Sequence, residues 1–68
     1  MENWISVFTT TVEYTAEGVK ALLERAGIPA VILSHKDSAY VMLGEINVMV
    51  PNDDAERAAR VINERQGE

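Results

Sequence analysis

The sequence predicts an α+β domain in which two helices cover one face of a three-stranded sheet. Three observations predict it. The apolar patterns follow one another along the chain in the order strand, helix, strand, strand, helix. Each predicted helix has one apolar stripe, so both helices need a shared apolar surface to pack on. The third predicted strand has branched aliphatic residues at alternate positions, and these can supply that surface.

The chain length fits one domain, which we expect to span residues 1–68. The hydrophobic fraction of 47% is typical of a folded chain. A chain this short buries only about 60% of its unfolded surface, and small domains often gain further stability from disulfides, metals or a partner chain. The sequence has no cysteine, which excludes disulfides and thiolate metal sites. Association with a partner chain is therefore the remaining source of further stability.

The net charge of −5, from eleven acidic and six basic residues, argues against two classes of partner. Nucleic-acid binding needs a basic surface to neutralise phosphates, and anionic membranes attract basic segments. Residues 1–4 contain no basic or apolar leader segment. No run approaches the roughly 18 apolar residues that span a bilayer. We therefore expect a cytoplasmic protein that binds neither nucleic acid nor membranes.

Residues 4–10 are predicted as the first strand because they are aromatic, β-branched and rich in threonine. Strict alternation places Ile5 and Val7 on one side of this strand. It places Trp4 and Phe8 on the other side. Both sides therefore carry large apolar groups.

Residues 15–26 are predicted as the first helix, with Thr15 as its N-cap. Gly27 follows the last periodic residue, where a left-handed backbone commonly closes a helix. Gly18 costs about 1 kcal/mol relative to alanine inside a helix, and the pattern gives no packing reason for it. The apolar stripe comprises Ala16, Val19, Leu22, Leu23 and Ala26.

The second strand is predicted at 30–34, a continuous apolar run of the length typical of a buried strand. The third is predicted at 45–50, after a bend at Gly44. Its two sides alternate, with Ile46, Val48 and Val50 on one and Glu45, Asn47 and Met49 on the other. The 40–43 stretch either extends this strand or forms a separate lead-in.

The second helix follows Pro51, which cannot continue a strand ladder. Residues 52–54 supply an N-cap candidate and two acids for a helix start. The predicted stripe comprises Ala55, Ala58, Ala59 and Ile62, and its small residues favour close approach to the sheet. Residues 64–68 are expected to fray.

These elements fit a ferredoxin-like arrangement that lacks its last strand, with an antiparallel sheet of order 1-3-2. One face of that sheet is covered by the helices, and the other displays Trp4, Phe8, Met49 and part of the second strand. The first strand is left as a free edge, and such edges recruit partners. The uncovered face is shielded either by another molecule or by the chain's own 40–43 segment.

Several runs resemble a small bacterial family of unknown function. They are NWISVFTT at 3–10, AEGVKALLE at 16–24, GIPA at 27–30 and GEINVMVP at 44–51. The family is described as "putative prokaryotic signal-transducing proteins". The resemblance implies a fold similar to that of the PII-type nitrogen regulators and a signalling role. PII-type proteins bind nucleotides with a long loop and basic residues, and the 35–39 connection of this chain has one lysine, so no family site residue is carried over.

No catalytic, metal or cofactor site is expected. His35, Asp37 and Ser38 stand together with Lys36, but triad members converge from separate segments and need an oxyanion hole. We interpret this stretch as a solvated connection, with a recognition loop as the alternative. One histidine and scattered carboxylates show no metal-ligand spacing.

The uncovered face favours a non-enzymatic interaction or regulatory module. We expect a homo-oligomer, a dimer first, formed through this face or the first-strand edge. Another protein is the other partner considered. The candidate interface residues are Trp4, Phe8, Met49 and Tyr40. The alternative is a small-molecule or nucleotide effector held between the same face and the 40–44 segment.

Overall fold

The computed structural model describes residues 3–34 and 45–66 of the chain. Predictions that fall on 35–44, which include Tyr40, the His35–Ser38 connection and the bend at Gly44, lie outside the described residues. The elements are β1 (Trp4–Thr10), α1 (Glu13–Arg25), β2 (Val31–Ser34), β3 (Ile46–Pro51), the 3₁₀ turn η1 (Asn52–Asp54) and α2 (Ala55–Gln66).

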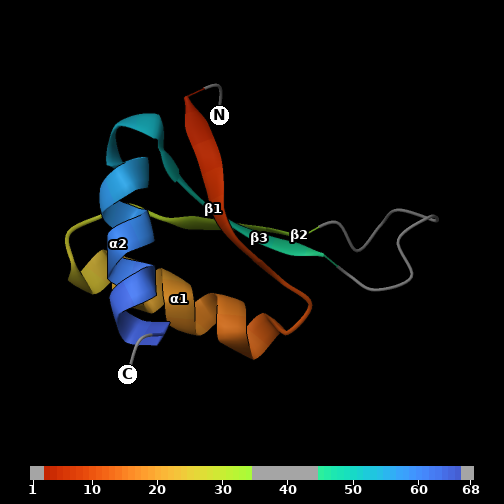
Figure 1. Ribbon diagram of the computed structural model, residues 1–68. Helices are drawn as coiled ribbons and strands as arrows, with labels where there is room; N and C mark the ends of the chain where they lie inside the picture. The colour runs from red at the N-terminus through yellow and green to blue at the C-terminus, as the bar shows by residue number, and fades with distance from the viewer. Residues whose placement is uncertain (1–2, 35–44, 67–68) are drawn as a thin grey trace.

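The predicted βαββα architecture is confirmed. β3 pairs antiparallel with both neighbours, which gives the sheet order β1-β3-β2. α1 and α2 pack against each other and against the same side of this sheet (Figure 1). The molecule therefore has two layers, and its shortest principal extent is 15 Å.

The first helix starts earlier than predicted, at Glu13, so Thr15 lies inside α1 and is not its N-cap. The N-cap is Val12, which has an extended backbone and no side-chain capping bond. The Thr10 hydroxyl instead accepts a hydrogen bond from the Val12 N–H at 3.1 Å. A side chain at the end of β1 thus orders the turn into the helix. Because this residue lies outside the usual capping position, the cap pattern of the sequence does not reveal it.

The C-terminus of α1 ends as predicted, at Gly27, whose φ is +83°. The Gly27 N–H donates to the Glu24 carbonyl at 3.0 Å, and the Ile28 N–H donates to the Leu23 carbonyl at 2.9 Å. This pair of bonds is the Schellman motif. Ile28 and Leu23 are both buried, so the apolar contact that accompanies the motif also begins the core.

β1 contains a bulge that changes which side chains face the helices. Ser6 pairs with Met49, but Phe8 pairs with Val48, so Val7 is an extra residue in β1. Directly paired residues lie on the same face of a sheet. Phe8 therefore shares the helix-covered face with Val48, and both Val7 and Phe8 pack against the core.

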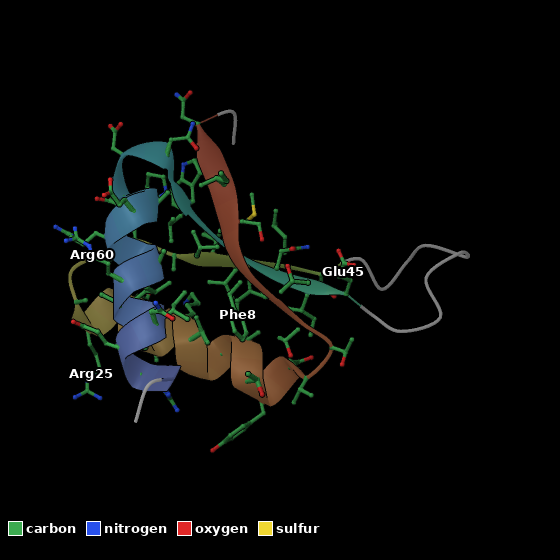
Figure 2. All side chains as sticks on the ribbon, viewed as in Figure 1. Phe8, Arg25, Glu45 and Arg60 are labelled. Atoms are coloured by element: carbon green, nitrogen blue, oxygen red, sulfur yellow. The ribbon has the colours of Figure 1, made fainter. Side chains whose placement is uncertain are left out.

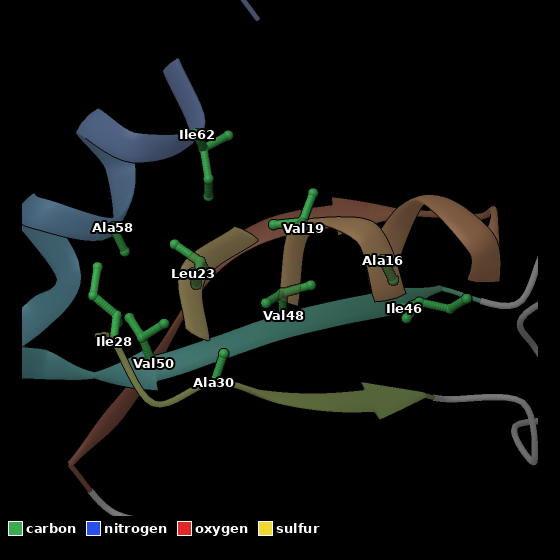
Figure 3. Close-up of a cluster of buried hydrophobic side chains, with 10 residues drawn as sticks. All are labelled: Ala16, Val19, Leu23, Ile28, Ala30, Ile46, Val48, Val50, Ala58 and Ile62. Atoms are coloured by element: carbon green, nitrogen blue, oxygen red, sulfur yellow. The ribbon is translucent and has the colours of Figure 1, made fainter. Parts of the chain in front are cut away.

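The core lies between β3 and the two helices (Figure 3). Its members are Ala16, Val19, Leu23, Ile28, Ala30, Ile46, Val48, Val50, Ala58 and Ile62. Three residues expected in the apolar layer are exposed: Ile5 keeps 46% of its surface accessible, and Ala26 and Ala59 are also exposed. Ile5 pairs with buried Val50, but it lies on an edge strand. Burial here falls off from the central strand to the edge.

Candidate interaction surface

The sheet face opposite the helices, called the open face below, is defined by the strand register. Row by row across β1, β3 and β2, it consists of Trp4 with Pro51, Ser6 with Met49 and Val31, and Thr9 with Asn47 and Leu33. The described part of the chain places no helix on this face. These side chains therefore decide what the face can bind.

The apolar part of the open face comes from all three strands. Trp4, Met49 and Val31 are half-buried, and Leu33 keeps 39% of its surface exposed. Together they form a patch that runs across the sheet. Contiguous apolar area of this kind is typical of an interaction site.

The polar part of the open face is a hydrogen-bonded trio. The hydroxyl groups of Ser6 and Thr9 both donate to the side-chain oxygen Oδ1 of Asn47, at 3.0 and 2.8 Å. Because Oδ1 accepts both bonds, the orientation of the Asn47 amide is fixed. Its N–H donors make no hydrogen bond with any residue in 3–34 or 45–66.

None of the strand residues on the open face carries a charge. The nearest charged residue along β3 is Glu45, just before the strand begins, whereas Arg25 and Arg60 project from the helices (Figure 2). In a chain of net charge −5, an uncharged face lets a second acidic molecule approach with little repulsion.

Two of the four predicted interface residues, Trp4 and Met49, lie on the open face. The predicted position of Phe8 is wrong: the bulge turns this ring to the helix side, where Figure 2 shows it between β1 and α1. Tyr40 lies outside the described residues, and so does the 40–44 segment of the predicted effector pocket. Whether any of these residues forms an interface stays a prediction.

The sequence predicted that part of the second strand lies on the uncovered face, and the register identifies the residues as Val31 and Leu33. β2 is an edge strand, as the predicted order 1-3-2 requires, and these two alternate residues share the face of Met49 and Asn47. The Asn47 trio was missed. The sequence does place the polar Asn47 on the same side of its strand as Met49. The positions of its two hydroxyl partners, Ser6 and Thr9, depend on the bulge between them.

β1 is an edge of the described sheet, and the bulge affects how regular that edge is. β1 carries no charged residue and no proline, two of the usual protections of an edge strand. The bulge at Val7 supplies a third protection, because it interrupts the regular ladder and increases the local twist. The open face is thus the better candidate for self-association.

Within the described residues, no group of three histidine or acidic side chains is placed to hold a metal ion. No helix in 3–34 or 45–66 has the length and apolar character needed to cross a bilayer.

A family model matches most of the chain. A family model described as "Putative prokaryotic signal transducing protein" covers residues 4–66, which confirms the resemblance found in the sequence. Searches of curated proteins and of solved structures return no match. The family description therefore provides the functional context for this fold.

Proposed function

The chain belongs to the family described as "Putative prokaryotic signal transducing protein", and we propose that it is a non-enzymatic regulatory module that dimerises through its open face. The observation that carries the proposal is the composition of that face. It combines an apolar patch with an oriented amide and has no charged strand residue. This combination suits a second copy of the same acidic chain.

The two-layer architecture supports the same proposal. Within the described residues, helices cover only one side of the sheet, and small domains commonly gain stability by association. In a face-to-face dimer, Leu33 and Trp4 of each copy would lose their contact with water. The Asn47 amide would gain a hydrogen-bond partner, which favours one relative orientation of the two sheets.

The test is sedimentation equilibrium of the full chain between roughly 1 µM and 1 mM, which covers moderate to weak affinities. We expect a monomer–dimer equilibrium in this range. Leu33→Thr should raise the dimer dissociation constant about tenfold, which corresponds to ~1.4 kcal/mol. Threonine is β-branched and suits a strand, so the fold should persist.

Ile5→Thr is the matched control. Ile5 and Leu33 are both large aliphatic residues on edge strands, with 46% and 39% of their surfaces exposed, but Ile5 is on the helix-covered side. Its substitution should leave the dissociation constant within twofold. A wild-type chain that stays monomeric at ~1 mM would overturn the proposal. Equal weakening by both substitutions would point to edge pairing and would also overturn it.

A further inference from the structure

A groove on the helix side of the sheet lies apart from the open face. It runs between α1 and the edge strand β2 and has a volume of about 420 Å³. Ala21, Ile32 and buried Ile46 contribute apolar surface to its floor, and Glu17 and Glu24 stand along its α1 wall. We infer that this groove binds an extended peptide whose side chains alternate between basic and apolar.

The backbone of β2 supplies the first argument. β2 is at the end of the sheet order, so one side of its backbone is not paired within the described sheet. Its register against β3 is regular from Val31 to Ser34, without a bulge, and none of its four residues is charged or proline. An added strand can therefore hydrogen-bond to β2, as extended peptides do at other free sheet edges.

The charge of the groove supplies the second argument. Lys20 forms an ion pair with Glu24 at 3.4 Å, which leaves the carboxylate of Glu17 in excess on this stretch of the wall. A lysine or arginine side chain fits such a groove because its aliphatic stem can lie over Ala21 and Ile32 while its charged end reaches the carboxylates. An acidic partner would be repelled.

The alternation of β2 supplies the third argument. Ile32 and Ser34 line the groove, whereas Val31 and Leu33 lie on the open face. A strand added to β2 has the same period of two. Its basic residues would therefore enter the groove, and its apolar residues would extend the patch around Leu33. This geometry favours a peptide of alternating pattern over a compact ligand.

The test uses a capped peptide of about seven residues that alternates arginine and valine, titrated into the ¹⁵N-labelled full chain at ~0.15 M salt, where distant charges are screened. We expect shifts at the amides of Val31–Ser34 and along the groove side of α1. A control peptide of the same composition, with its arginines and valines in separate blocks, should bind about tenfold more weakly. Equal binding of both peptides would show simple charge attraction and overturn the proposal.

Matched charge variants complete the test. Glu17→Gln with Glu24→Gln should weaken binding of the alternating peptide about fivefold. Glu56→Gln with Glu64→Gln changes the net charge equally on α2, away from the groove, and should leave affinity within twofold. Equal loss in both pairs, or shifts confined to Ser6 and Asn47, would contradict the groove. The titration is run at a protein concentration where the chain is monomeric, so its result does not depend on dimerisation.

Discussion

The two faces of β3 differ in burial and in the kinds of side chain that they carry. On β3, Ile46, Val48 and Val50 have at most 2% of their surface exposed, whereas Asn47 and Met49 between them are only half-buried. The covered side is purely apolar and is closed by two helices. The other side is mixed, uncharged and carries an oriented amide. The first side of β3 accounts for folding, and the second leaves its side chains accessible to a second copy of the chain.

The same substitution made on each side of the sheet tests the contrast between the two faces most directly. Leu23→Ala removes a fully buried side chain beneath α1 and should lower the free energy of unfolding by about 3 kcal/mol. Leu33→Ala makes the same change on the open face and should cost less than about 1 kcal/mol in the monomer. Urea denaturation at low micromolar concentration measures both. Similar losses would mean that the open face contributes to the monomer core.

A substitution of Phe8 tests whether the bulge places this ring on the helix-covered face of the sheet. Because its ring packs against the core, Phe8→Ala should destabilise the chain by about 2 kcal/mol. The dissociation constant of the dimer should stay unchanged as long as the variant is folded. Sedimentation and urea denaturation of the same sample separate the two effects. If the variant instead keeps its stability and loses association, the ring lies on the open face after all.

Gly18 gives the smallest expected effect and concerns the helix layer alone. It borders a second groove, of about 250 Å³, between α1 and α2, and a methyl group at this position would meet no atom within 4 Å. Gly18→Ala should therefore stabilise α1 by up to about 1 kcal/mol. Neither dimerisation nor binding of the alternating peptide should change. Thermal denaturation measures the gain, and a loss of stability would mean that this groove is filled.

The sequence was sufficient for the order of elements, the sheet order and most of the core, because these follow from periodicity. The alternation of Ile46, Val48 and Val50 and the left-handed Gly27 were both confirmed. The position of Phe8 was not predictable by alternation, because the bulge occurs at Val7 without a glycine to mark it. The start of α1 was missed because the hydroxyl that orders it belongs to Thr10 in the preceding strand.

The open face was only partly predictable for a related reason. A residue's face follows from its own strand's period, but its exposure depends on where that strand lies in the sheet. Leu33 reaches the surface because β2 is an edge, and Ile5 does so on β1 for the same cause. The Asn47 trio needs three residues from two strands in register, which periodicity alone does not supply.

The bulge in β1 shifts the alternation of side chains along the strand by one position. The alternation between the two sheet faces before Val7 is out of step with the alternation after it. Trp4 and Phe8 therefore face opposite ways, although they are separated by an even number of positions. Deleting Val7 would remove the bulge and leave every other side chain of β1 opposite its present partner and on its present face. To assign side chains of this strand to a sheet face from sequence, one therefore has to count alternate positions separately on each side of the bulge.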